Sequence, residues 1–140
     1  MAGLVPIVKP QVAFFEQLGA SGMVALAKVI RYAIDKDLLV VADAKRNDIG
    51  TTAEAYAAAF LGRGPDSSWG SDALTVSPYL GEDSLQPFVD RAHANGSGLF
   101  VLVKTSNPGS GFIQDLKVES RSISQRLADW VQQATTAVPS

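Results

Sequence analysis

An acid, a base and a second acid follow one short apolar segment of the chain. Asp43, Lys45 and Asp48 come directly after four branched aliphatic residues at positions 38–41. Residues i and i+2 of a strand point to the same side, so Asp43 and Lys45 can touch, and Asp48 can reach back from the loop that follows. A lysine held charged between carboxylates is a positioned proton donor. This spacing favours proton-transfer chemistry at the end of a strand.

Two other interpretations fit the same residues. The charges could form a solvated polar loop that caps the strand, because exposed charged residues are common at such positions. The carboxylates of Asp43 and Asp48 could instead hold magnesium, which prefers oxygen ligands. Lys45 lies between them in the sequence and competes for the same oxygens. That competition makes the metal interpretation the weaker of the two.

Apolar patterning predicts the elements that position these charges. Short apolar runs predict strands, and apolar residues at helical spacing between them predict helices. The strands are expected at 4–8, 38–41, 72–77 and 99–103, and the helices at 11–18, 23–34, 52–60, 85–95 and 123–134. Gly19 is expected to close the first helix, and Thr51 with Glu54 has the spacing of a capping box at the start of the third. Gly96 is expected to close the fourth.

Strands that alternate with helices predict an α/β fold with a parallel sheet. The carboxyl ends of parallel strands meet at one edge, so Lys9, Asp43, Lys45 and Ser106 should lie at the same end. That end is the functional face of a (β/α)₈ barrel, which needs about 250 residues. We therefore expect residues 1–140 to form a single partial barrel domain of about four β/α units. A four-stranded open sheet is the alternative on length.

Composition excludes several classes of function. The chain has 46% hydrophobic and 19% charged residues, as is typical of one globular domain. Its net charge of -2 predicts no binding to nucleic acid or to an anionic membrane. The lack of cysteine, with a single histidine, excludes disulfides and the common zinc sites. No apolar run approaches the roughly 20 residues of a membrane helix and no signal peptide is evident, so we expect a cytoplasmic protein.

Four segments together resemble one enzyme family. The segment 43–52, DAKRNDIGTT, resembles the Asp-x-Lys-x-x-Asp-Ile-x-x-Thr signature of orotidine 5'-phosphate decarboxylases. Segments 8–16 (VKPQVAFFE), 75–81 (TVSPYLG) and 105–108 (TSNP) resemble neighbouring strand ends of the same family, in its longer-chain bacterial branch. The resemblance covers only the central part of the family's sequence.

The resemblance implies a cofactor-free, metal-free decarboxylation of orotidine 5'-monophosphate to uridine 5'-monophosphate, in pyrimidine biosynthesis. Asp43 would crowd the substrate carboxylate, Lys45 would stabilise and protonate the carbanion, and Lys9 would brace Asp43 and contact the ribose. Ser106 would bind the pyrimidine. The family works as a homodimer, and the residues that would cross into the partner's site are Asp48, Ile49 and Thr52.

The resemblance also implies that strands are missing. The family's first strand should precede the one that ends at Lys9, and its last three strands carry an arginine and glycine-rich turns for the substrate phosphate. Unpaired edges of a half barrel disfavour a stable monomer. We therefore expect the isolated chain to have little or no activity. The alternatives are a magnesium-dependent decarboxylase of sugar-acid phosphates, with the metal on Asp43 and Asp48, and a non-catalytic fragment that binds a nucleotide or a partner.

Overall fold

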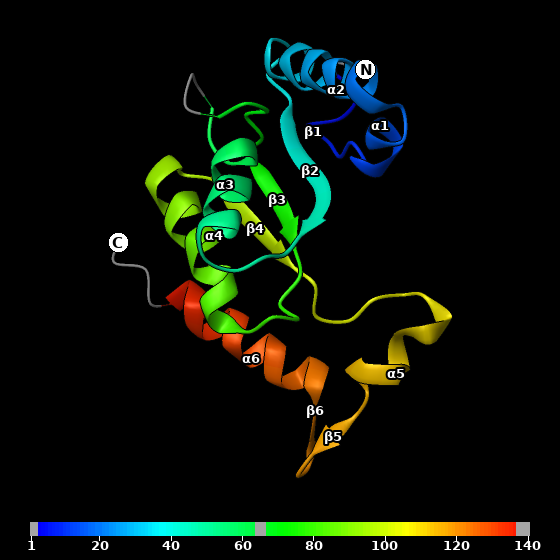
Figure 1. Cartoon of the computed structure of the whole chain (residues 1–140), viewed down its shortest axis with the longest axis vertical. Helices are drawn as coiled ribbons and strands as arrows, with labels where there is room; N and C mark the ends of the chain where they lie inside the picture. The colour runs from blue at the N-terminus through cyan, green and yellow to red at the C-terminus, as the bar shows by residue number, and fades with distance from the viewer. Residues whose placement is uncertain (1–2, 64–66, 137–140) are drawn as a thin grey trace. The chain divides into compact units, whose positions relative to one another are not determined.

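The computed structural model describes residues 3–63 and 67–136, which contain strands and helices in alternation (Figure 1). The elements, in chain order, are β1 (Ile7–Val8), α1 (Ala13–Glu16), α2 (Gly19–Ile34), β2 (Leu39–Arg46), α3 (Gly50–Phe60), β3 (Ala73–Val76), α4 (Glu82–Asn95), β4 (Gly98–Val101), η1 (Pro108–Ser110), α5 (Gly111–Gln114), β5 (Lys117–Val118), β6 (Arg121–Ser122) and α6 (Ile123–Thr136). They form two compact units, Met1–Phe100 and Val101–Ser140, and we describe each by itself.

The first four strands form one sheet in the order β1-β2-β3-β4. β1 pairs with β2 and β2 pairs with β3, in both cases in parallel. Consecutive strands are therefore neighbours, as in a (β/α)₈ barrel, whereas the strand order of a doubly wound sheet reverses at a switch point. This order confirms the predicted α/β fold and favours part of a barrel over an open doubly wound sheet.

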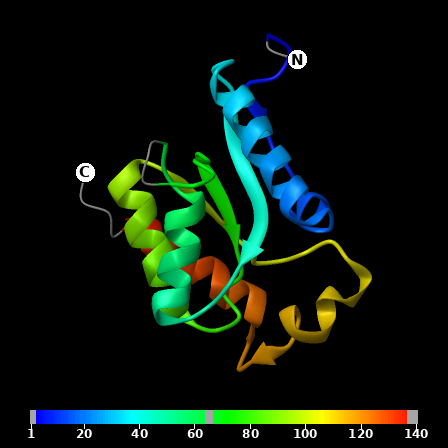
Figure 2. The ribbon, with the colours of Figure 1, turned by 45° about the horizontal axis from the view of Figure 1, so that its top comes forward.

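Helices α2 and α4 of the first unit each bury one apolar stripe. Leu26 and Ile30 of α2 and Leu85 and Phe88 of α4 are at most 1% exposed, and the fully buried strand residue Val40 belongs to the same core. Their spacing is that of a helix with one inward face. Figure 2 shows α2 alongside β2. α4 ends at Gly96, whose φ of +62° is left-handed, so the predicted glycine cap is confirmed.

The strand that carries the charges is longer than predicted. β2 runs from Leu39 to Arg46, so Asp43 and Lys45 lie inside the strand and do not follow it. Its register against β3 shifts between Ala42 and Arg46, where β2 advances by four residues while β3 advances by two. This is a β-bulge, and bulges re-aim side chains next to active sites. The prediction stopped at position 41 because a bulge leaves no trace in hydrophobic periodicity.

Other predictions at the ends of elements were wrong as well. β1 contains only Ile7 and Val8 of the predicted 4–8, because Pro6 has no amide hydrogen for a ladder. Gly19 begins α2 and does not close the helix before it, which is the single turn α1. The capping box at the start of α3 is absent, since the N-cap residue is Ile49 and no side chain caps it.

The second unit contains four short elements, η1, α5, β5 and β6, and the longer helix α6. β5 and β6 form an antiparallel pair, and the amide of Ile123 donates to the carbonyl of Leu116 at 2.9 Å as α6 begins. Arg121 pairs with Asp129 at 2.5 Å on the surface of this unit. The predicted final helix is confirmed, and the predicted strand at 99–103 is observed as β4, Gly98–Val101.

Candidate active site

Two lysines and one aspartate form a charged cluster at the carboxyl ends of β1 and β2. The Lys45 ammonium lies 2.5 Å from Oδ1 of Asp43, and the Lys9 ammonium donates to Oδ2 of the same carboxylate. The Asp43 side chain is 8% exposed, whereas Lys9 and Lys45 are 56% and 46% exposed. Each lysine therefore reaches solvent, and a ligand, while it stays paired. The sequence predicted this pairing from the i, i+2 spacing of Asp43 and Lys45.

Two uncharged side chains complete the hydrogen bonds of Asp43. Thr75 donates from Oγ1 to Oδ1 at 3.0 Å, and Gln11 donates from Nε2 to Oδ2 at 3.2 Å. Neither residue was predicted to belong to the site. Each had a signal: Gln11 lies two positions after Lys9 and shares its side of the chain, and Thr75 is a hydroxyl within an otherwise apolar strand.

These donors keep Asp43 ionised. Burial alone raises the pKa of a carboxyl group, but hydrogen bonds from Lys45, Lys9 and Thr75, with the charge of Lys45, lower the pKa of Asp43 from 3.8 to about 2. Asp43 is thus a fixed negative charge at neutral pH and cannot supply a proton there. The acidic protons next to it are those of the two ammonium groups.

The backbone of the bulge is fixed on both of its sides. Lys45 has a φ of +50°, a left-handed conformation that is uncommon for a residue other than glycine. Its amide donates to Oγ1 of Thr75 at 2.9 Å. The side chain of the next residue, Arg46, pairs with Glu16 of α1 and lies 5.3 Å from the ring centre of Tyr56 in α3. Arg46 thereby joins the end of β2 to two helices.

The other predicted site residues are Asp48, Ile49 and Thr52 in the first unit and Ser106 in the second. Asp48 accepts a hydrogen bond from the amide of Ile49 at 2.9 Å, and within the described part of the chain it makes no bond to Lys45. Ile49 is 58% exposed, and Thr52 is exposed in the first turn of α3. Ser106 is exposed in the second unit, between β4 and η1. The roles of these four residues stay predictions.

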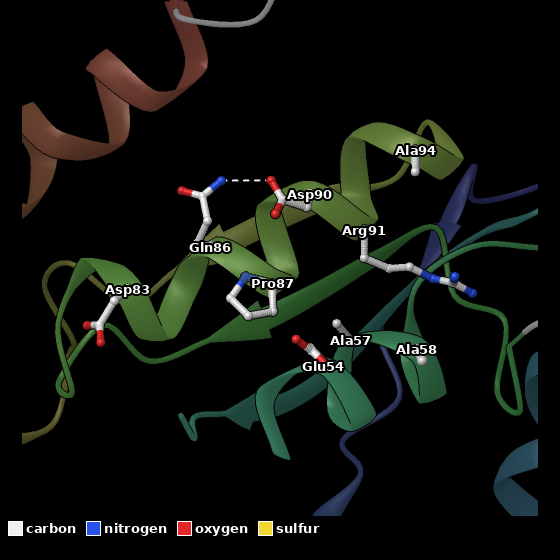
Figure 3. A pocket seen from close by; sticks show the side chains of 9 residues that line it. All are labelled: Glu54, Ala57, Ala58, Asp83, Gln86, Pro87, Asp90, Arg91 and Ala94. Carbon is white, nitrogen blue, oxygen red and sulfur yellow. Dashed lines mark hydrogen bonds between the residues drawn. The ribbon is translucent and has the colours of Figure 1, made fainter. Parts of the chain in front are cut away.

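A separate hollow of about 530 Å³ lies between α3 and α4 (Figure 3). It is lined by Glu54, Ala57, Ala58, Asp83, Gln86, Pro87, Asp90, Arg91 and Ala94. Gln86 donates to Asp90 at 2.7 Å on its rim. No residue of the lysine–aspartate cluster lines this hollow, so the charged chemistry of the chain lies elsewhere.

Within residues 3–63 and 67–136, no group of three or more histidine, cysteine, aspartate or glutamate side chains could hold a metal ion. Both oxygens of Asp43 already accept hydrogen bonds, including one from a lysine each. A magnesium ion on Asp43 would have to displace an ammonium group. No helix within these described residues is long and apolar enough to cross a membrane.

Known proteins match the chain along almost its whole length. It is 62% identical over 133 residues to an orotidine 5'-phosphate decarboxylase of Rhodopirellula baltica, and the match covers 94% of this chain and 44% of the relative. It is 50% identical over 124 residues to the enzyme of the same name from Streptomyces coelicolor, covering 88% and 44%. The chain therefore spans less than half the length of these relatives.

Solved structures show the same relationship. A Streptomyces avermitilis structure matches with a TM-score of 0.88 and 45% identity, covering 99% of this chain and 49% of that one. The OMP decarboxylase of Leishmania donovani matches with a TM-score of 0.77 and 44% identity, covering 88% and 46%. A family profile described as "Orotidine 5'-phosphate decarboxylase / HUMPS family" matches residues 2–138. The chain therefore belongs to the orotidine 5'-phosphate decarboxylase / HUMPS family.

Proposed function

We propose that this chain is the catalytic central segment of an enzyme that decarboxylates orotidine 5'-monophosphate to uridine 5'-monophosphate. The observation that carries this proposal is the Asp43 carboxylate held between Lys9 and Lys45 at the carboxyl ends of neighbouring parallel strands. Preorganised charges can stabilise a developing carbanion without a bound electron sink. Relatives 62% and 50% identical to the chain carry the name of this activity.

Asp43 acts as a fixed negative charge. Its pKa is lowered to about 2 in the chain without substrate, so the carboxylate is ionised at neutral pH before the carboxylate of the substrate is placed next to it. Like charges in a partly closed site repel, and departure of neutral carbon dioxide relieves that repulsion. The interaction is thus more favourable in the transition state than in the bound substrate, which is the condition for catalysis.

Lys45 acts as electrostatic stabiliser and proton donor. The bond between the pyrimidine ring and the carboxylate breaks, carbon dioxide leaves, and the electron pair stays on the ring carbon. The Lys45 ammonium lies 2.5 Å from Asp43 and the Lys45 side chain is 46% exposed, so the ammonium can face that carbon. Transfer of its proton to the carbon yields uridine 5'-monophosphate, and the neutral amine regains a proton from solvent.

The remaining predicted residues bind the substrate. Lys9 braces Asp43 and contacts the ribose, and Ser106 donates to the pyrimidine. Asp48, Ile49 and Thr52 serve the site of a second subunit in a homodimer. The 58% exposure of Ile49, a large apolar residue at the head of α3, supports an interface there.

The proposal is tested with a hybrid enzyme in which this chain replaces the matching segment of the Rhodopirellula baltica relative. The hybrid should release carbon dioxide from orotidine 5'-monophosphate at the same rate with and without a chelator. A folded hybrid that is inactive would contradict the proposed function, and activity abolished by the chelator would favour the magnesium-dependent alternative. The 140-residue chain alone should be inactive. Binding of uridine 5'-monophosphate to this chain, with an inactive hybrid, would favour the non-catalytic alternative.

A further inference from the structure

One buried hydroxyl contacts both members of the Asp43–Lys45 pair. Thr75 lies in β3 and is 8% exposed. Its Oγ1 donates to Oδ1 of Asp43 at 3.0 Å and accepts from the amide of Lys45 at 2.9 Å. A hydroxyl offers one donor and two acceptor positions, so both bonds form at once. Oδ1 of Asp43 is also the atom that receives the Lys45 ammonium.

The bulge in β2 explains why this hydroxyl is needed. Leu74 and Val76 pair with β2 on either side of the bulge, at Ala42 and Arg46, and Thr75 is the residue between them. The shifted register interrupts the backbone ladder in this segment, and a part-buried amide without a partner costs free energy. The Thr75 side chain supplies the acceptor for the Lys45 amide. It thereby holds a lysine whose φ is +50°.

We infer that Thr75 is a positioning residue for the decarboxylation: its hydroxyl fixes the Asp43 carboxylate and the Lys45 backbone in one arrangement. This inference rests on the proposed function. Without the hydroxyl the bulge can relax, and the Lys45 ammonium moves away from Oδ1. A misplacement of about 1 Å at a reacting group can cost about a hundredfold in rate.

Two variants separate the hydroxyl from the volume of the side chain. Thr75→Val keeps the shape and removes the hydroxyl, whereas Thr75→Ser keeps the hydroxyl and removes the methyl group. Thr135→Val is the control for the substitution itself, because Thr135 is exposed in α6 and its hydroxyl donates to the carbonyl of Val131 in the same helix. The first readout is amide hydrogen exchange at Lys45 in the 140-residue chain, and the second is kcat and KM of the hybrid enzyme.

In Thr75→Val, the Lys45 amide should exchange about tenfold faster, as loss of one hydrogen bond implies, and kcat should fall about a hundredfold with little change in KM. Thr75→Ser should restore both readouts to within about fivefold of the parent, with both bonds available again. Unchanged exchange and kcat in Thr75→Val would overturn the inference, as would equal losses in the two variants. The parent hybrid could be inactive while exchange of the Lys45 amide still depends on the Thr75 hydroxyl. That result would overturn the proposed function, but it would support the contact of Thr75 with Lys45.

Discussion

Asp43 is the residue on which the cluster depends, because four side chains donate to its two oxygens. Lys9 and Gln11 occupy Oδ2, and Lys45 and Thr75 occupy Oδ1. A buried charge is costly unless it is paired and hydrogen-bonded, and here both conditions hold. Loss of the carboxylate would leave two ammonium groups facing each other. The negative charge of Asp43 therefore organises the site before any substrate binds.

The lowered pKa of Asp43 predicts a pH-dependent contribution to stability. A carboxyl whose pKa falls on folding stabilises the folded state above its unfolded pKa of 3.8, and this stabilisation is lost as the pH falls through about 2. The free energy of unfolding of the parent chain minus that of Asp43→Asn should therefore fall by about 2 kcal/mol as the pH is lowered from 5 to 2. Urea unfolding across this range measures it.

Asp90→Asn is the matched control, because the Asp90 carboxylate is exposed and accepts a hydrogen bond from Gln86. The difference in free energy of unfolding between Asp90→Asn and the parent chain should change much less over the same pH range. If the difference in free energy of unfolding between the parent and Asp43→Asn stays constant from pH 5 to pH 2, folding does not lower the pKa of Asp43.

Among the elements, α1 and α2 lie so close together that only glycine fits at one position. A Cβ on Gly22 of α2 would overlap the carbonyl oxygen of Phe15 and would lie 2.8 Å from Cβ of Leu18. α1 also carries Glu16, which pairs with Arg46 at the end of the bulge. The close approach of these helices therefore supports the strand that carries the site.

Gly22→Ala should destabilise the chain by about 2 kcal/mol, because the backbone of α1 must move to admit the methyl group. Urea unfolding checks this value. Gly109→Ala is the control, since a Cβ there meets only Nδ2 of Asn107 at an ordinary 3.6 Å. Equal stability of the Gly22→Ala variant and the parent would contradict the observed packing of α1 on α2.

The sequence was sufficient to predict the four strands of the sheet and the helices α1 to α4 and α6 in their order, because apolar spacing reports burial directly. The short elements between β4 and α6, which are η1, α5, β5 and β6, were not predicted. The sequence was also sufficient to predict that Lys9, Asp43 and Lys45 lie together at one edge of the sheet. It could not predict the bulge, since the extra residues of β2 are specified by pairing with β3, a strand distant in the sequence. Thr75 was missed for the same reason: its role depends on which residue lies opposite Lys45.

In the whole molecule, the site is expected to draw on two subunits. Asp43 and Lys45 would serve their own subunit, and Asp48, Ile49 and Thr52 would serve the partner's. Two apolar strand residues of the sheet are exposed. Ile7 and Leu39 are register partners in β1 and β2, and they are 43% and 49% exposed. The remaining strands of a barrel would cover such residues. This exposure agrees with a chain that spans 44% of the length of two of its relatives.

Mixed dimers test the shared site. Hybrid enzymes carrying Lys45→Ala or Asp48→Ala should each be inactive. After subunit exchange at equal concentrations, half of the dimers contain both variants, and one of their two sites is intact, so roughly a quarter of the parent activity should return. A mixture of two Lys45→Ala preparations is the control. If the mixture of the two variants stays inactive although exchange has occurred, Asp48 does not act across the interface.

The most direct test of the central claim is the rate of orotidine 5'-monophosphate decarboxylation by the hybrid enzyme with Lys45→Ala. Loss of both the stabilising charge and the proton donor should lower kcat by at least about a thousandfold. Lys117→Ala, a change in exposed β5, should leave kcat within about twofold of the parent, since surface substitutions away from a site have small effects. Near-normal turnover by a folded Lys45→Ala hybrid would show that Lys45 is not the proton donor.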